Sequence, residues 1–312
     1  MGPHPAVAEV RRAVRAALIG PALVACSGGA DSFALAAAVA FEAPRAGISA
    51  GLVTVDHGLQ PGSDAQAKAV AELGYELGFD PVEIVRVDVG RHGGPEAAAR
   101  TARYGAIDGV ADALGMDVLL GHTLDDQAET VLLGLGRGSG PRSIAGMRPV
   151  ERRYRRPFLD LRRSTTEAAC RALGLVPWDD PHNADPSYQR ARLRHEVMPL
   201  LEDVLQGGVA AALAQTAALV RDDVDALDEL STMYMATELS VGDLQTLPRA
   251  IRTRVLRAWA HQHGTAALTA THIAALDALI TNWHGQGPID LPGGFEAVRA
   301  SGRLDLRAKQ RG

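Results

Sequence analysis

The chain has 312 residues, which is long for one domain and enough for two. Hydrophobic residues make up 46% and charged residues 22%, as in an ordinary globular protein whose core needs neither a metal nor a disulfide. The two cysteines, Cys26 and Cys170, are too few for a disulfide scaffold or a four-cysteine metal site. Because there is no signal-peptide pattern and no apolar run near the ~20 residues of a membrane span, we expect a cytoplasmic protein without membrane contact.

Short β-like runs alternate with helical stretches over the first two-thirds of the chain. The predicted strands are residues 22–26, 51–55, 82–87 and 118–120, and the predicted helices are residues 32–41, 64–77, 95–114 and 125–135. This alternation predicts an α/β fold with a doubly wound, mostly parallel, Rossmann-like sheet. In such sheets ligands bind beyond the carboxyl ends of the strands.

The pattern changes near residue 200. Residues 204–238 and 248–259 have helical patterns, and residues 289–307 contain the glycine turns and alternation of a β-hairpin. We therefore expect a nucleotide-binding catalytic domain over residues 1–200 and a second, smaller, mainly helical domain over residues 206–312, which ends in a β-hairpin.

A glycine-rich loop follows the first predicted strand and precedes a helix: Ser27-Gly28-Gly29-Ala30-Asp31-Ser32. The glycines let backbone N–H groups turn toward an anion, and the helix start adds free N–H groups and a positive dipole end. Asp31 cannot donate to a phosphate, so beside phosphates it suits Mg²⁺. The alternative is an ordinary strand-to-helix turn in which Asp31 or Ser32 caps the helix. No Gly-Lys-Ser/Thr follows, so this is not a Walker loop.

An acidic helix start follows the fourth predicted strand. On a helix, Asp125, Asp126 and Glu129 share one face, next to an apolar face and directly after His122. Carboxylates crowded in this way suit a divalent metal or an ammonium group. The alternative is capping, because Thr123 followed three residues later by Asp126 resembles a capping box, which explains one or two of the acids.

The glycine-rich loop resembles the PP-loop of the ATP pyrophosphatase superfamily, whose members include GMP synthetase and several tRNA-modifying enzymes. More specifically, residues 20–200 resemble the tRNA(Ile)-lysidine synthetase family. The motifs that carry this resemblance are GHTLDDQAET at 121–130, RGSG at 137–140, GM at 146–147, VDHGL at 55–59, EAAAR at 96–100, RY at 103–104, RPFL at 156–159, WDDPHN at 178–183 and the run 188–201. The chain resembles the short form of the family, without a further C-terminal domain.

The resemblance implies an ATP-dependent ligase acting on the wobble cytidine of the CAU anticodon of tRNA(Ile). The cytidine carbonyl oxygen attacks the α-phosphorus of ATP and pyrophosphate leaves; the amine of free L-lysine then displaces AMP. The implied ligands are ATP, Mg²⁺, L-lysine and tRNA(Ile), and a homodimer is left open as the assembly.

The resemblance also implies roles for individual residues. ATP binding falls to Ser27, Gly28, Gly29, Ala30, Asp31, Ser32 and Asp56. Catalytic roles fall to Asp31, His122, Asp126, Glu129 and Arg100. We expect Mg²⁺ to be held by Asp31 and Asp126, and the lysine amine to be bound by Asp125, Asp126 and Glu129.

Basic side chains cluster between residues 137 and 171. Ten arginines stand there against three acids, although the whole chain has a net charge of −5. Such a patch can steer a nucleic acid whatever the total charge. Together with the helical C-terminal domain, tRNA contacts are expected from Arg152, Arg153, Arg155, Arg156, Arg190, Arg192 and Arg194. The alternative is that these arginines are scattered, solvated or paired with acids of the C-terminal domain.

Two positions depart from the family pattern within the segment expected to meet the nucleic acid. Ala191 stands where asparagine is usual, and His182 where serine is usual. The neighbouring arginines are kept, so the departures bear on details of tRNA contact.

Three other functions compete with this assignment. Thiolation of tRNA by a PP-loop relative needs catalytic cysteines or an iron–sulfur cluster, and the sequence has no Cys-x-x-Cys. A GMP synthetase-like amidotransferase needs an ammonia source, and no glutaminase domain is evident. A non-catalytic nucleotide sensor would not need the acidic helix face.

Overall fold

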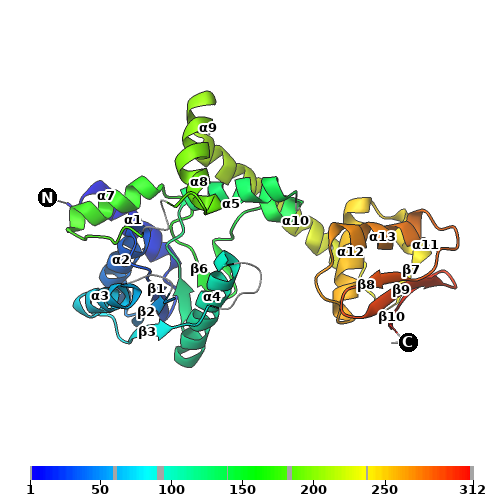
Figure 1. Cartoon of the computed structure of the whole chain (residues 1–312), viewed down its shortest axis with the longest axis horizontal. Coiled ribbons are helices and arrows are strands. Elements are labelled where there is room, and N and C mark those ends of the chain that lie inside the picture. The colour runs from blue at the N-terminus through cyan, green and yellow to red at the C-terminus, as the bar shows by residue number, and fades with distance from the viewer. Residues whose placement is uncertain are drawn as a thin grey trace. The chain divides into compact units, whose positions relative to one another are not determined.

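The computed structural model describes residues 2–58, 62–89, 95–138, 140–180, 185–236 and 238–309, with only the backbone of residues 95–97. Two compact units are present (Figure 1). The first consists of Met1–Gly136 and Gly146–Ala217, and the second of Arg137–Ala145 and Ala218–Gly312. His182 and the motif residues Leu59, Ser139 and Asn183 lie outside the described residues.

The first unit is built on a six-stranded sheet of order β3-β2-β1-β4-β6-β5. The strands are β1 (Ala22–Ala25), β2 (Ala50–Asp56), β3 (Val82–Arg86), β4 (Asp117–Leu119), β5 (Val150–Glu151) and β6 (Tyr154–Arg155). All neighbours are parallel except β5 and β6. This confirms the predicted doubly wound, mostly parallel sheet. The strand order reverses between β1 and β4, which places a ligand crevice at their carboxyl ends.

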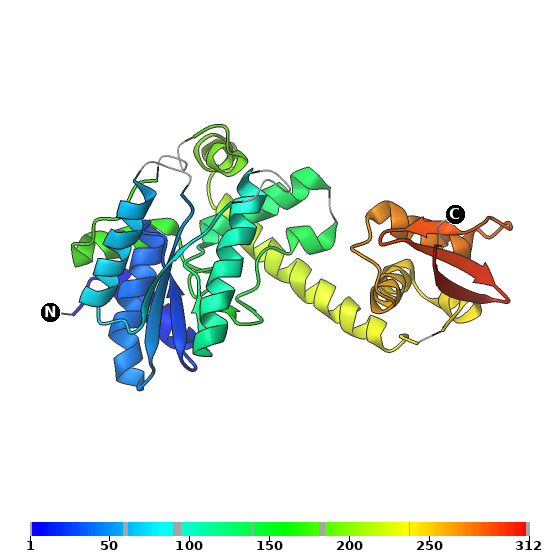
Figure 2. The same ribbon diagram turned by 60° about the horizontal axis from the view of Figure 1, so that its bottom comes forward.

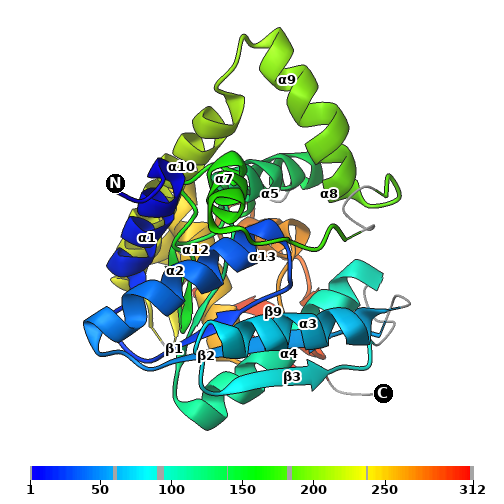
Figure 3. The same cartoon turned by 90° about the vertical axis from the view of Figure 1, so that its left-hand side faces the viewer.

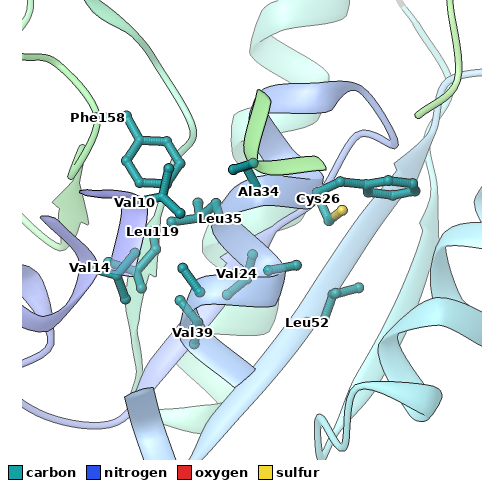
Figure 4. Packing of buried hydrophobic residues seen from close by; sticks show 14 of the residues in the cluster. Val10, Val14, Val24, Cys26, Ala34, Leu35, Val39, Leu52, Leu119 and Phe158 are labelled. Carbon is teal, nitrogen blue, oxygen red and sulfur yellow. The ribbon is translucent and has the colours of Figure 1, made fainter. Parts of the chain in front are cut away.

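Helices cover both faces of this sheet, as Figures 1 and 2 show. On one face lie α1 (Pro5–Ala17), α2 (Ala30–Ala46), α3 (Ser63–Glu76) and α7 (Arg163–Leu173), and on the other lies α4 (Pro95–Leu114). Each face of the sheet has its own hydrophobic core, and alternate strand residues belong to one or the other because successive residues point to opposite faces. Val24 packs with Leu35 and Leu119 under α2 (Figure 4), whereas Leu23 packs with Ile107 of α4.

The predicted helix over residues 188–201 is divided into three parts. They are α8 (Gln189–Arg192), a π-helical turn η2 (Leu193–Val197) and α9 (Met198–Val204). The Met198 N–H bonds the Leu193 carbonyl five residues back. Pro199 follows and has no N–H to continue an α-helical ladder, so the wider turn absorbs the break.

The long helix α10 (Val209–Thr232) follows, and the chain passes into the second unit between Ala217 and Ala218. The short helix α6 (Pro141–Ile144), which follows α5 (Leu124–Arg137), also belongs to this second unit. There Arg142 pairs with Asp228 at 2.6 Å. The predicted boundary near residues 200–206 precedes the change of unit, because the first turns of α10 still pack in the first unit.

The second unit packs helices on an antiparallel sheet of order β7-β10-β9-β8 (Figure 1). Its elements are β7 (Leu239–Ser240), α11 (Val241–Thr246), α12 (Arg249–Gln262), α13 (Ala270–Thr281), β8 (Ile289–Leu291), β9 (Phe295–Ala300) and β10 (Arg303–Ala308). Trp259 and Leu276 are buried between helices and sheet. The range predicted as one hairpin, residues 289–307, contains β8, β9 and most of β10; β8 pairs with β9 and β9 with β10, and β7 extends the sheet beside β10.

In the described part of the chain, no single helix has both the length and the apolar character to cross a membrane. One sharply bent pair, Gln189–Val204 with Val209–Thr232, meets that test by length and composition alone.

Candidate active site

The glycine-rich loop joins the carboxyl end of β1 to the first turn of α2. Its N–H groups converge, because those of Ser27 and Gly28 both donate to Ser32 Oγ at 3.2 Å. Gly28 has a φ of 91°, and a Cβ there would lie 2.4 Å from Gln66 Nε2, so a side chain would be strained. Ser32 Oγ occupies the point where these donors converge, so a phosphate oxygen would take its place or bind beside it at the helix N-terminus.

His122 follows β4 on the other side of the switch point. The preceding Gly121 lets β4 approach α2, because a Cβ at Gly121 would lie 3.0 Å from the Asp31 carbonyl group. The Nδ1 of His122 is buried and has no hydrogen-bond partner among the described residues. Burial lowers the pKa of His122 to about 3, although Asp126 opposes this shift, so the imidazole is neutral near pH 7.

Asp126 lies in the first turn of α5, where its two oxygens have different partners. Oδ2 accepts from the N–H and hydroxyl of Thr123 at 2.8 and 2.9 Å, which is the helix cap. Oδ1 accepts from Arg163 Nη2 at 2.8 Å and from Arg194 Nη2 at 3.4 Å. Burial raises its pKa, but Arg163 and Thr123 outweigh burial and lower the pKa of Asp126 below its ordinary value. The capping interpretation of Asp126 is therefore confirmed, and its role in binding a metal or an amine stays a prediction.

Glu129 is the most deeply buried acid of the helix, with 1% of its surface exposed. Its Oε1 accepts from Arg194 Nε at 2.9 Å and from Arg163 Nη2 at 3.4 Å. The same Arg163 reaches Asp31 on α2, Nε to Oδ2, at 3.5 Å. Thr166, one turn further along α7, donates to the other oxygen of Asp31. The glycine-rich loop and the acidic helix are thus joined through one guanidinium.

Asp125 connects α5 to α7. Its Oδ2 accepts the backbone N–H of Arg163 at 2.8 Å, and its Oδ1 lies 3.0 Å from Arg162 Nη2. This carboxylate therefore caps α7, which has no acid in its own first turn.

A pocket of about 220 Å³ lies next to these acids. Its lining residues are Asp125, Glu129, Arg162, Arg163, Arg194, Met198, Pro199 and Glu202. Glu202 is held by the start of α10, where it accepts the N–H groups of Val209 and Ala210 at 3.0 and 3.1 Å. The pocket combines carboxylates with guanidiniums, so it can hold the ammonium and carboxylate groups of an amino acid.

Cationic groups gather near the two histidines of this sheet end. His57 follows β2, and its Nδ1 is also buried without a partner in the described part of the chain. Burial lowers the pKa of His57, and Arg103 on α4 lowers it further. The charge of Arg103 also lowers the pKa of His122, although less than burial and Arg156 do. Arg100 lies one helical turn away, with its Nη2 3.3 Å from the Tyr104 hydroxyl.

Asp56 is buried at the end of β2. Its Oδ1 accepts the Gly58 N–H at 2.9 Å. The Ser63 hydrogen bond holds the pKa of Asp56 below its ordinary value, and the Gly58 bond adds to the effect. The carboxylate shapes the start of the loop after β2, and its contact with ATP stays a prediction.

The arginines of α8 and η2 divide between two directions. Arg194 binds Glu129 and Asp126, and Arg190 Nη2 lies 3.4 Å from the Thr130 hydroxyl of α5. Arg192 instead forms an exposed pair with Glu196 at 2.8 Å. Arg190 and Arg194 are four residues apart and share a helix face, whereas Arg192 lies between them in sequence and points away.

The predicted tRNA arginines of the β5–β6 hairpin do not come together at the carboxyl end. Arg153 pairs with Asp108 and Asp112 near the end of α4, and Arg155 pairs with Asp117 at the start of β4 at 2.8 Å. These acids mark the amino end of the parallel strands, away from the glycine-rich loop. Arg152 occupies the hairpin turn with a φ of 55°.

Arg156 behaves differently from its neighbours in the hairpin. It is buried, and its Nη1 donates to the Arg148 carbonyl at 2.8 Å. Its positive charge lowers the pKa of His122, which lies at the carboxyl end of the sheet. The role of all four hairpin arginines in tRNA binding stays a prediction.

Sequence reasoning missed Arg163, Thr166, Arg103 and Glu202 as site residues. One signal for Arg163 was present: Arg162 and Arg163 open a helix that has no acid in its first turn, where positive charge is unfavourable. Such a start requires a carboxylate from elsewhere, which Asp125 supplies. Thr166 and Glu202 carried no comparable signal.

Comparison with known families agrees with this geometry. Residues 8–201 match the family model described as PP-loop domain, and residues 239–304 match the TilS substrate binding domain. Among solved structures, the U34-tRNA thiolase NcsA from Methanococcus maripaludis with its 4Fe-4S cluster has a TM-score of 0.58 at 16% identity. The similarity covers 70% of this chain and 80% of that one, and it shows a shared fold.

Relatives of known name cover nearly the whole chain. The tRNA(Ile)-lysidine synthase of Salinispora tropica is 57% identical, over 96% of this chain and 96% of the relative. That of Thermobifida fusca is 55% identical, over 98% and 99%. With both family models in one chain and these near full-length matches, the protein belongs to the tRNA(Ile)-lysidine synthase family of PP-loop enzymes, as an ATP-dependent ligase that modifies tRNA(Ile).

Proposed function

We propose that this chain joins free L-lysine to the wobble cytidine of the CAU anticodon of tRNA(Ile), giving lysidine, AMP and pyrophosphate. The observation that carries the proposal is a cation-seeking site beside the glycine-rich loop. The carboxylates there are Asp31, Asp125, Asp126, Glu129 and Glu202, and the guanidiniums are Arg162, Arg163 and Arg194. Five carboxylates against three guanidiniums leave an excess of two negative charges, which suits the ammonium groups of lysine.

The first step is adenylation of the cytidine. Its ring carbonyl oxygen attacks the α-phosphorus of ATP, the bond to the β-phosphate breaks and pyrophosphate leaves. Ser27, Gly28 and Ser32 offer the donors that hold the phosphates. The neutral imidazole of His122, whose Nδ1 has no partner among the described residues, can donate to an α-phosphate oxygen.

Mg²⁺ is compatible with Asp31 and Asp126 only when phosphates complete its coordination. Among the described residues, no group of three His, Cys, Asp or Glu side chains could hold a metal alone. The charge of Asp126 nevertheless raises the pKa of Asp31, so the two carboxylates are near each other. Mg²⁺ is commonly bound by one or two carboxylates together with substrate phosphates. When bound there, the ion would neutralise charge on the phosphates.

The second step is transfer to lysine. The neutral amine attacks the activated ring carbon, the carbon–oxygen bond to AMP breaks, and the amine loses a proton. Glu129 and Asp126 are placed to hold the ammonium before it gives up a proton, and Arg162 or Arg194 can pair with the lysine carboxylate. Asp125 contributes by fixing α7 and the pocket wall.

The tRNA is expected at the cationic end of the same crevice. Arg100 and Arg103 lower the pKa of His122, and Arg190 is close enough to Arg103 to lower the pKa of that arginine; the anticodon phosphates would pass along these three arginines. We place the reaction in the cytoplasm, where tRNA and free lysine occur together. A homodimer stays a prediction.

Transfer of radiolabelled lysine tests the proposal. Purified protein is incubated with a tRNA(Ile) transcript carrying the CAU anticodon, labelled lysine and Mg²⁺, with and without ATP. We expect label in the tRNA only with ATP, one AMP formed per lysine, and none with a transcript whose wobble base is uridine. Label that enters without ATP, or AMP released without lysine transfer, would contradict the proposal.

A further inference from the structure

Arg163 lies where the ATP loop and the lysine pocket meet. Its guanidinium reaches Asp31 at 3.5 Å, Asp126 at 2.8 Å and Glu129 at 3.4 Å. Asp31 belongs to the helix that follows the glycine-rich loop, whereas Asp126 and Glu129 belong to α5. Arg194 forms ion pairs with Asp126 and Glu129, and its charge lowers the pKa of Asp31 without an ion pair. Among the described arginines, Arg163 alone forms ion pairs with both sides.

Hydrogen bonds fix the backbone of Arg163, whereas its guanidinium is shared among several carboxylates. The Arg163 backbone N–H donates to Asp125, and its carbonyl oxygen lies 2.7 Å from the Thr166 hydroxyl, whose single hydrogen serves Asp31. The side chain is 18% exposed. Burial opposes its charge, but Asp126, Glu129 and Asp31 outweigh burial and raise the pKa of Arg163. It therefore stays a cation and can move only between neighbouring carboxylates.

We propose that Arg163 is a positioning residue that couples ATP binding to lysine binding. ATP with one Mg²⁺ still brings net negative charge to the glycine-rich loop, and its phosphates draw the guanidinium toward the loop. Glu129 then keeps Arg194 but loses part of the compensation from Arg163. The pocket, whose lining has three carboxylates and three guanidiniums, then gains net negative charge at Glu129, and an ammonium group binds more tightly. This inference rests on the proposed function, because it takes lysine as the pocket's ligand.

The coupling is reciprocal by thermodynamic necessity, so lysine must tighten ATP by the same factor. As a consequence, the lysine amine is bound firmly only when ATP is present to activate the cytidine. Arg194 acts on Asp31 only through its charge and forms no ion pair with it, so Arg163 is the direct link between the two sides.

Isothermal titration calorimetry on the full chain tests the coupling. Lysine is titrated with and without Mg²⁺ and an ATP analogue that has a methylene bridge between the α and β phosphates. We expect the analogue to tighten lysine binding about tenfold in the wild-type chain, within the range of coupled sites. Arg163→Met keeps the length of the stem and removes the charge, and we expect its coupling factor to fall to about one.

Two further variants separate coupling from folding. Arg163→Lys keeps a positive charge beside the carboxylates but cannot bridge three of them, so its coupling should fall to about threefold or less. Arg171→Met is the matched control, because Arg171 is an exposed arginine on the same helix, and it should keep the wild-type factor. Thermal unfolding of each variant confirms that it is folded.

Undiminished coupling in Arg163→Met and Arg163→Lys, or no coupling in the wild-type chain, would overturn the role of Arg163. Failure of the wild-type chain to bind lysine at all would overturn the proposed function itself, and this inference with it. The two failures are distinguishable, because the first leaves lysine binding intact.

Discussion

Arginine–carboxylate pairs lie at both ends of the six-stranded sheet, but they differ in burial and in balance. At the carboxyl end, Glu129 is 1% exposed beside Arg163, which is 18% exposed. At the amino end, Arg153 is 31% exposed and its partner Asp112 is 66% exposed. Figure 3 shows α7, which carries Arg163, close to α1, α2 and α5.

The difference teaches how to distinguish a site from a surface. Exposed ion pairs contribute about 0–1 kcal/mol and tolerate change. Buried charges are costly unless they are paired, and an excess of one sign is retained where a ligand completes the balance. The carboxyl end has such an excess, whereas Arg153 and Arg155 at the amino end already have their acids. The following predictions test this contrast, from the largest expected effect to the smallest.

Replacement of Asp31 should have the largest effect. Asp31→Ala removes the carboxylate between the glycine-rich loop and Arg163, so we expect tRNA-dependent ATP–pyrophosphate exchange to fall at least a hundredfold. Asp112→Ala, at the amino end, is the control and should stay within about twofold. Near-normal exchange by folded Asp31→Ala protein would leave Asp31 with a capping role only.

Glu129→Gln should weaken lysine recognition while tRNA binding changes little. The amide keeps the shape but removes a buried charge, a loss of about 1.5–3 kcal/mol, or roughly tenfold to a hundredfold in the KM for lysine. Steady-state kinetics with varied lysine, and a filter-binding assay for tRNA, separate the two effects. An unchanged KM and rate would move the amine site elsewhere.

The pH dependence of kcat/KM for ATP should follow the ionisation of Asp31 and not that of His122. Burial raises the pKa of Asp31 to about 6, so its ionised form is present above that pH and is lost below it. We expect kcat/KM for ATP to fall about tenfold per pH unit below 6. His122 has its pKa lowered by burial to about 3 and is neutral throughout this range.

Two variants assign this acidic limb. The Thr166 hydrogen bond lowers the pKa of Asp31, against the effect of burial, so Thr166→Val should move the limb to higher pH. His122→Asn should slow the reaction and leave the limb in place. A limb that moves with His122 and ignores Thr166 would refute the assignment to Asp31.

The smallest effect is expected from the amino-end arginines. Three phosphate contacts would change the slope of log affinity against log salt by about two units. Because Asp108, Asp112 and Asp117 already pair with Arg153 and Arg155, we expect the triple alanine variant of Arg152, Arg153 and Arg155 to change that slope by less than about one unit. A slope change near two units would support the tRNA path predicted from sequence and would contradict the difference between the two sheet ends.

Local patterns were sufficient for much of the fold. Strand–helix alternation predicted the parallel sheet because each signal, an apolar run or a helical period, is contained in a few consecutive residues. The C-terminal hairpin was predicted from its glycine turns for the same reason. The helix predicted over residues 188–201 is present as a continuous helix over Gln189–Val204, but the π-helical turn that precedes Pro199 was not predicted.

The sequence by itself determined the chemistry available at the strand ends: the glycines and hydroxyls of the loop, His122 after β4, and the carboxylates of Asp126 and Glu129 on one helix face. These follow from backbone geometry within one element. Only the tertiary structure decided which arginines meet them. Arg163 and Arg194 come from α7 and η2, whereas Arg153, equally prominent in the sequence, is held at the opposite end of the sheet. The reason is that pairing between distant elements depends on strand order and direction, which a count of charges along the chain does not contain.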